Sequence, residues 1–292
     1  MGMAGMAGMA GKATMNRRAR RRAEGAQPTQ DPPLGAPYCA FGQKLLLVDR
    51  DGLVGELLRL AQCSKTCRFV ANLNMNALHH LARSPDFRAA YSQAHASHID
   101  GSPLVPILKA AGLPARMEHR NGYIDFVHPL LAGAAELGLG VATIGGRPEM
   151  QSDLRNRLVA QHSGLKLLTH HGYFDAEEEN LELANKIQAF APRVTIVGMG
   201  MPKQEVWIER NLTNMPPGLI LNGGGVLELL AGERWIPPRW LGNFGLEWAA
   251  RLARYPRFWR RYLLEPFPTL PSVLREIRAL RANRGLAGSA QT

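Results

Sequence analysis

The sequence predicts an α/β fold, in which a mostly parallel, Rossmann-like sheet has helices on both faces and a helical C-terminal appendage follows. From residue 43 onward, short apolar runs alternate with segments of helical periodicity, and such alternation implies right-handed crossovers between parallel strands. The runs hold few polar residues, as expected for strands covered on both faces. Strands are expected at 44–48, 68–73, 97–99, 140–144, 165–168, 193–197 and 218–221, and helices at 53–62, 77–81, 103–111, 124–137, 149–161, 176–190 and 204–211.

Composition divides the 292 residues into three regions. Residues 1–36 combine a Gly-Met-Ala repeat with an arginine-rich run, which cannot bury a core, so they are expected to form a disordered basic tail. Residues 37–245 form the predicted α/β domain, and residues 246–292 form the appendage. The net charge is +11, yet residues 37–248 are formally neutral. A nucleic-acid-binding core would itself be basic, so this distribution favours tails that attach to an anionic surface.

The expected location is the cytoplasm, at the inner face of the cytoplasmic membrane. No window of about 20 residues is continuously apolar, so no transmembrane helix is expected, and the N-terminus lacks a signal-peptide pattern. Only three cysteines occur, without metal-ligand spacing, which fits a reducing compartment.

An aromatic stripe predicts how the appendage meets the membrane. Tyr255, Phe258, Trp259 and Tyr262 follow helical spacing and share one face, with arginines among them. Aromatic rings and guanidinium groups suit the headgroup region of a bilayer. The alternative is a stripe that packs on the protein's own core.

Glycine-rich turns end several predicted strands, at 145–148, 198–202 and 222–225. In a parallel sheet these turns share the carboxyl edge, where glycine lets backbone N–H groups approach phosphate. None matches a P-loop or dinucleotide fingerprint, and each could be a plain tight turn. Three such turns in one domain favour a nucleotide diphosphate ligand.

Polar residues end two further strands. Asp100 follows a short strand and precedes a glycine, a position suited to a general base and also to a helix N-cap. Asn72 and Asn74 are two residues apart, so their side chains share a face and could bind sugar hydroxyls. Their alternative role is to form a turn or a cap.

These segments together resemble the WecG/TagA/CpsF family of bacterial glycosyltransferases, with matching order and spacing from about residue 68 to about residue 262. The most specific element is the run from Val197 to Glu205, which contains Pro-Lys-Gln-Glu. The other matching segments are Asn72-Leu73-Asn74, Ile99-Asp100-Gly101, Gly145-Gly146-Arg147-Pro148-Glu149, Gly172-Tyr173-Phe174 and Gly245-Leu246-Glu247-Trp248 with Arg251 and Leu252.

The resemblance implies an inverting hexosyltransferase, acting without cofactor or essential metal. It would move a sugar from a UDP-sugar to an undecaprenyl-diphosphate-linked sugar in exopolysaccharide, O-antigen or teichoic-acid-like synthesis, with Asp100 as base. N-acetylmannosamine, glucose and glucuronate all fit as donor sugars, and a homo-oligomer is compatible with the sequence. The expected substrate-binding residues are Asn72, Asn74, Arg120, Asp125, Gly145, Gly146, Gly200, Lys203, Gln204, Glu205, Gly224 and Glu228, and those for the lipid diphosphate are Arg251, Arg257 and Arg261.

The sequence departs from the family pattern in several segments. Asn72 stands where threonine is frequent, Glu228 where aspartate is frequent, and the glycine between Arg120 and Asp125 is shifted. An appendage arginine is replaced by Phe258, with Arg257 beside it. These changes bear on sugar identity rather than on reaction class.

Three other interpretations remain open. Asp49 and Asp51 in Asp-Arg-Asp-Gly could bind a metal in a metal-dependent glycosyltransferase or serve a haloacid-dehalogenase-like phosphatase, although a solvated turn also fits. A non-catalytic membrane adaptor is the second, and a nucleic-acid binder, disfavoured by the neutral core, is the third.

Overall fold

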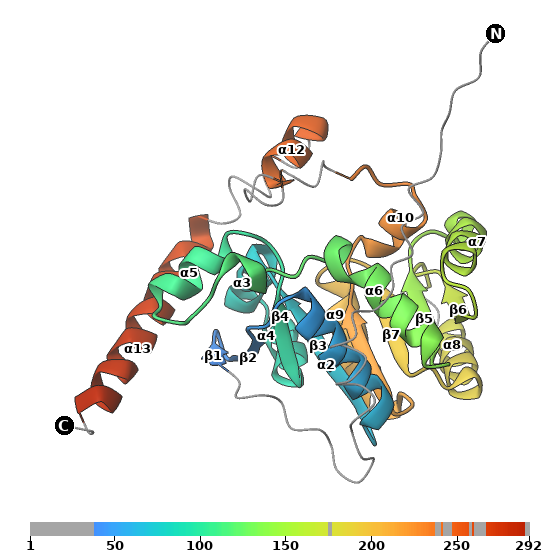
Figure 1. The fold of residues 1–292 in the computed structure, drawn as a ribbon, viewed down its shortest axis with the longest axis horizontal. Coiled ribbons are helices and arrows are strands. Elements are labelled where there is room, and N and C mark those ends of the chain that lie inside the picture. The colour runs from blue at the N-terminus through green and yellow to red at the C-terminus, as the bar shows by residue number, and fades with distance from the viewer. Residues whose placement is uncertain are drawn as a thin grey trace.

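The computed structural model describes residues 38–174, 177–236, 247–256 and 267–289, together with Leu241 and Trp259 (Figure 1). The predicted basic tail, residues 1–36, lies outside the described residues. So do Gly245 and Leu246 of the Gly-Leu-Glu-Trp segment, and Arg257, Phe258, Arg261 and Tyr262 of the appendage.

One eight-stranded sheet forms the centre of the molecule, in the order β1-β2-β4-β3-β8-β7-β5-β6. Only the pairing of β1 with β2 is antiparallel, and every other pairing within this sheet is parallel. The mostly parallel sheet is therefore confirmed, with β1 as an unpredicted edge strand. The strands are β1 Tyr38–Ala40, β2 Gln43–Leu46, β3 Cys67–Leu73, β4 Ala96–Ile99, β5 Gly140–Gly145, β6 Lys166–His170, β7 Val194–Gly198 and β8 Gly218–Asn222.

Helices cover both faces of this sheet, as predicted. Strand β8 illustrates the arrangement, because Leu219 and Leu221 join one hydrophobic cluster and Ile220 joins the other. One cluster includes residues of α2 Arg50–Cys63, α6 Tyr123–Glu136, α7 Gln151–Gln161 and α10 Val226–Leu230. On the other face lie α3 Met75–Arg83, α4 Pro85–Ser92, α5 Leu104–Ala110, α8 Glu177–Phe190 and α9 Lys203–Asn211. The described residues also include 3-10 turns at Met117–His119, Pro148–Met150, Leu212–Asn214 and Phe267–Thr269.

The order of strands in the sheet places the carboxyl ends of β4, β3, β8 and β7 next to one another. Strands β3 and β4 come from the first half of the chain, whereas β7 and β8 come from the second half. In open parallel sheets the ligand site lies in the crevice outside this edge, near the point where the strand order reverses. The polar residues that end these four strands are therefore the ones to examine for function.

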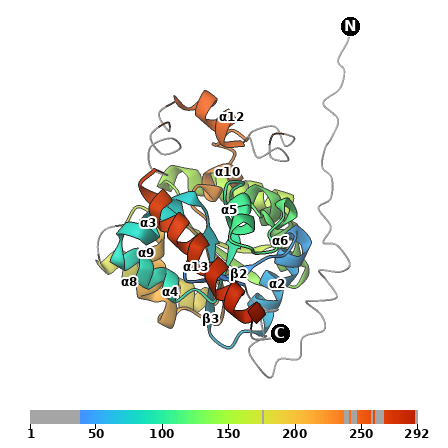
Figure 2. The same ribbon diagram turned by 90° about the vertical axis from the view of Figure 1, so that its left-hand side faces the viewer.

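The two described helices of the C-terminal region differ in their surroundings. Helix α12 Glu247–Arg254 stands apart from the α/β body in both views, whereas α13 Leu270–Ser289 crosses its surface (Figures 1 and 2). Val273 of α13 is buried, and Glu276 Oε1 accepts a 2.7 Å hydrogen bond from the Phe41 N–H. Part of the predicted appendage thus packs on the domain. Within the described residues, no helix has both the length and the apolarity needed to cross a bilayer.

Candidate active site

Asp100 lies directly after β4 and is held in place by the neighbouring strand. Its N–H donates to the Leu73 carbonyl at 2.8 Å, and its Oδ2 accepts a 3.0 Å hydrogen bond from Asn72 Nδ2. Gly101 has φ +99°, and the next helix, α5, takes Pro103 as its N-cap. Asp100 is therefore not the cap of α5, and its half-buried carboxylate points toward the end of β3 instead.

The two predicted asparagines occupy different positions at that strand end. Asn74 Oδ1 caps α3 by accepting from the Ala77 N–H at 2.9 Å. Its Nδ2 donates to Asn72 Oδ1 at 2.8 Å, so the shared face predicted for the pair is confirmed. Asn72 is buried and links Asn74 to Asp100. One asparagine thus begins a helix, while the other orients the carboxylate.

Beneath Asn72 lies a buried polar network that the sequence did not predict. Asn222, at the end of β8, accepts from the Asn72 N–H through Oδ1 at 2.7 Å and donates through Nδ2 to Glu205 Oε1 at 2.7 Å. The Tyr91 hydroxyl donates to the Asn72 carbonyl at 2.6 Å. Burial raises the pKa of Glu205 and that of Tyr91. The sequence did contain one sign of this network, because Asn222 is a polar residue at the end of an otherwise apolar strand.

Gln204 and Glu205 contribute to the site from below its surface. Both side chains are 0% exposed. Gln204 Oε1 accepts from the N–H groups of Gly200 and Gly224, at 3.2 and 2.9 Å, and its Nε2 donates to Glu205 Oε1 at 2.7 Å. Their buried atoms connect the glycine turns to the network around Asn72, and the contact with substrate expected for both residues stays a prediction.

Glycines from four adjacent strand ends form a continuous ridge, which we call the glycine ridge and define as Gly172, Gly145, Gly198 and Gly224. A Cβ added to Gly145 would lie 2.2 Å from the Gly198 carbonyl oxygen, and one added to Gly172 would lie 2.9 Å from Gly145 Cα. A Cβ on Gly198 would lie 2.8 Å from the Gly224 oxygen. Only glycine permits this close approach of neighbouring strand ends.

Two cationic side chains lie beside these elements. Lys203 Nζ donates to the Gly172 carbonyl at 3.3 Å and lies 5.9 Å from the centre of the Phe174 ring. Arg120 Nη2 is 3.4 Å from Asp125 Oδ2, and both side chains are largely buried. A Cβ on Gly122 would lie within 3.3 Å of carboxylate oxygens of both Asp100 and Asp125. The Arg120–Asp125 ion pair therefore neighbours Asp100.

The glycine ridge, the carboxylate at the end of β4 and the Pro-Lys-Gln-Glu helix start can be compared with known families. Residues 38–283 match the model of the glycosyl transferase WecG/TagA/CpsF family. The chain belongs to that family of glycosyltransferases. Because the match covers most of the chain and includes every residue of the network described above, the network is part of the family's domain.

Of the remaining predicted residues, Gly146 and Glu228 lie outside the polar network. Gly146, with φ +70°, follows the ridge and donates its N–H to the Gly198 carbonyl at 3.3 Å. Glu228 is exposed, and its Oε2 is 3.8 Å from Arg234 Nη1. Arg251 belongs to α12, but its side chain lies outside the described residues, as do Arg257 and Arg261. The lipid-diphosphate role of these three arginines stays a prediction.

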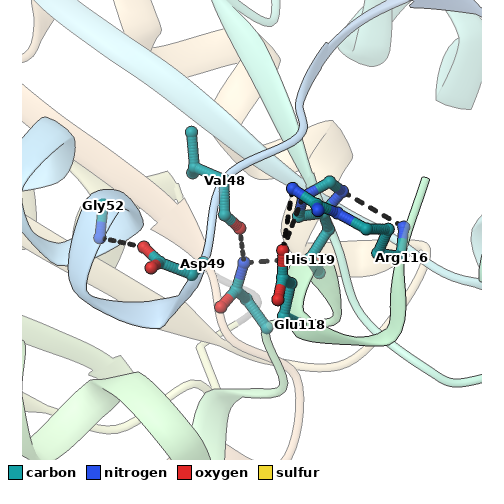
Figure 3. A network of polar contacts seen from close by, with 7 residues as sticks. Val48, Asp49, Gly52, Arg116, Glu118 and His119 are labelled. Atoms are coloured by element: carbon teal, nitrogen blue, oxygen red, sulfur yellow. Dashed lines mark hydrogen bonds and ion pairs between the residues drawn. The ribbon is translucent and has the colours of Figure 1, made fainter. Parts of the chain in front are cut away.

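The Asp-Arg-Asp-Gly segment has a structural role. Asp49 is the N-cap of α2, where its Oδ1 accepts from the Gly52 N–H at 2.8 Å (Figure 3). Asp51 Oδ1 accepts from Arg50 Nε at 3.0 Å. Nearby, the Val48 carbonyl accepts from Asn121 Nδ2 at 2.9 Å. The described residues contain no group of three or more histidine, cysteine or acidic side chains placed to hold a metal. Asp49 thus has a capping function that needs no phosphatase chemistry.

Proposed function

We propose that this glycosyltransferase moves a hexose from a UDP-sugar to a polyprenyl-diphosphate-linked sugar during synthesis of a bacterial cell-surface polysaccharide. The observation that carries the proposal is the position of the Asp100 carboxylate. It accepts a hydrogen bond from the Asn72 side-chain amide, and it lies at the same carboxyl edge of the sheet as the glycine ridge. A base beside a diphosphate cradle is the arrangement that glycosyl transfer needs. Membership of the family supplies the reaction class.

In the proposed mechanism, Asp100 accepts the proton of the acceptor hydroxyl. The resulting oxygen attacks the anomeric carbon from the side opposite the diphosphate, and the bond from that carbon to the phosphate oxygen breaks. The sugar passes through an oxocarbenium-like transition state and emerges with inverted configuration. Asn72 Nδ2 orients the carboxylate before the proton arrives, which reduces the reorganisation needed at the moment of reaction.

The departing UDP gains negative charge, which the carboxyl edge is equipped to stabilise. The ammonium of Lys203, which donates to the Gly172 carbonyl, is the cationic donor at this edge. Hydrogen bonds from charged or preorganised donors are the strong ones in such sites. Gln204 holds two of the glycine turns at a fixed spacing through its single carbonyl oxygen.

The deciding experiment offers the purified full chain a panel of UDP-sugars and a short-chain prenyl-diphosphate-sugar acceptor. We expect UDP release with one donor, a product one sugar heavier by mass spectrometry, inverted anomeric configuration by NMR, and unchanged turnover in a chelator. If no donor is bound and none releases UDP, the proposal is refuted and an adaptor is favoured. Phosphate release without sugar transfer would favour a phosphatase instead.

We further propose that the appendage docks on an anionic membrane, with Trp259, 47% exposed, among its contacts. Deleting the whole appendage would also remove Val273 and Glu276, which pack on the domain, so charge reversal is the cleaner test. Replacing Arg251, Arg257 and Arg261 by glutamate should weaken flotation with phosphatidylglycerol vesicles at least about tenfold, since each basic residue near such a surface contributes about 1 kcal/mol.

The matched control makes the same change in charge at Lys44, Lys65 and Lys166, which are exposed near the amino ends of strands, on the opposite edge of the sheet. That variant should bind vesicles nearly as the wild type does. Equal loss of binding in both triple variants would show that net charge alone, and not the appendage, is responsible.

A further inference from the structure

Glu205 is a fully buried carboxyl group that the proposed reaction does not use. It is the third residue of α9, and its side chain is 0% exposed. Its Oε1 accepts two hydrogen bonds of 2.7 Å, one from Gln204 Nε2 and one from Asn222 Nδ2. Its Oε2 has no hydrogen-bond partner among the residues that the structure describes. Burying a carboxyl group with one oxygen unpaired costs free energy, so a compensating role is expected.

The geometry of Oε1 determines which way two side-chain amides face. An amide presents a donor at one end and an acceptor at the other, whereas Oε1 only accepts. Asn222 and Gln204 must therefore turn their NH₂ groups toward Glu205 and their carbonyl oxygens away from it. Protonation of the buried carboxyl group would leave this unchanged if the proton resides on Oε2, because Oε1 would then remain a carbonyl acceptor.

Each oriented amide then acts on a different part of the site. Asn222 Oδ1 accepts the Asn72 N–H, and Asn72 Nδ2 reaches Asp100 Oδ2. Gln204 Oε1 accepts the N–H groups of Gly200 and Gly224. Reversing either amide would place two donors face to face, which would break these contacts.

We propose that Glu205 is a positioning residue whose buried Oε1 orients the Asn222 and Gln204 amides and thereby fixes the Asp100 carboxylate relative to the glycine turns. The catalytic consequence rests on the proposed role of Asp100 as base, whereas the structural consequence does not. In this role Glu205 acts through the two amides and not through contact with substrate, because its side chain is enclosed.

The test compares three variants of the full chain. Glu205→Met keeps the approximate volume and removes the acceptor. Glu205→Gln keeps an amide oxygen that can take the place of Oε1. Ser97→Ala is the matched control, because Ser97 is also 0% exposed and lies in β4 before Asp100, yet its hydroxyl donates to Gln43 Oε1 outside the network.

The first measurement is amide hydrogen exchange by NMR, which needs no substrate. We expect Glu205→Met to speed exchange at the N–H groups of Asn72 and Gly224 by at least about tenfold, the effect of losing roughly 1.4 kcal/mol of hydrogen bonding. The N–H of Ile220, in the middle of β8, serves as internal reference for general loosening. Glu205→Gln and Ser97→Ala should leave the ratio of Asn72 to Ile220 exchange near its wild-type value.

The second measurement is steady-state kinetics, where a misplaced base lowers kcat more than it raises the acceptor KM. We expect Glu205→Met to lower kcat roughly 10- to 100-fold with an acceptor KM within about threefold of wild type, and Glu205→Gln to restore most of kcat. If Glu205→Met does not fold, Glu205→Asp, which withdraws the carboxyl group by one methylene, should show the same accelerated exchange at Asn72.

Two results would overturn the positioning role. One is wild-type protection of the Asn72 N–H in a folded variant without the acceptor, and the other is a Glu205→Gln variant as impaired as Glu205→Met. If the wild type transferred no sugar, the proposed function would fail, and the exchange data would still decide whether Glu205 orients the network.

Discussion

Two aspartates follow neighbouring parallel strands at the same edge of the sheet, yet they have different local roles. Asp49 comes after β2 and Asp100 after β4, and the register pairs Leu46 with His98. Asp49 is exposed and caps a helix. Asp100 is half-buried, and its carboxylate accepts a hydrogen bond from the side-chain amide of Asn72 on the adjacent strand. Position at a strand end therefore does not by itself distinguish a structural carboxylate from a candidate base.

The difference arises from how closely each aspartate is followed by the next helix. Helix α2 begins at Arg50, immediately after Asp49, so the carboxylate meets the free N–H of Gly52. Helix α5 begins at Leu104, and Gly101 turns the chain with a positive φ before it. Asp100 is thereby directed to Asn72 rather than to a helix end.

The largest expected effect separates the two carboxylates by activity. Asp100→Asn should lower turnover by roughly 10²–10⁴, the usual contribution of a general base. Asp49→Asn is the matched control, because asparagine is as good an N-cap as aspartate. It should keep turnover close to wild type, as followed by UDP release. Full activity of Asp100→Asn, or an inactive but folded Asp49→Asn, would reverse the assignment.

The strand before each aspartate differs as well, and this predicts a pH effect on stability. His98 of β4 is fully buried against Tyr123 and Phe126, and burial lowers its pKa to about 4 from 6.5. Between those values the unfolded chain binds a proton that the native chain does not, so stability falls as pH falls from about 6.5 to about 4. The contribution of His98 to that loss is about 3 kcal/mol.

His98→Leu should remove this contribution, so that denaturant unfolding at pH 7 and at pH 4.5 gives a smaller difference in free energy than in the wild type. His95 and His162, whose pKa values burial also lowers to about 4, remain in both proteins and cancel in the comparison. An unchanged pH slope in His98→Leu would mean that His98 is not buried as a neutral side chain.

The sequence predicted the sheet and most of its helices because apolar periodicity and glycine turns are local signals. It also brought Asp100, Asn72 and the glycine turns to one edge, since parallel strands share their carboxyl ends. It did not predict that Asn222 and Tyr91 lie beneath Asn72, 150 and 19 residues away along the chain. The order of strands decides such contacts, and no local pattern encodes that β8 lies beside β3. The alternative N-cap role weighed for Asp100 belongs instead to Asp49.

The smallest expected effect concerns the helix cap at Asp49. Here Asp49 should matter more than Asp100, because the quantity measured is stability and not activity. Asp49→Ala should reduce the free energy of unfolding by about 1 kcal/mol, because the Gly52 N–H loses its acceptor at the start of α2. Asp49→Asn should restore most of that loss in urea denaturation, while sugar transfer stays near wild type in both variants. Asp100→Asn, which removes no helix cap, should not reproduce this pattern of loss and rescue. An Asp49→Ala variant that unfolds as the wild type does, but loses transfer, would place Asp49 in the chemistry and would undo the distinction between the two strand ends.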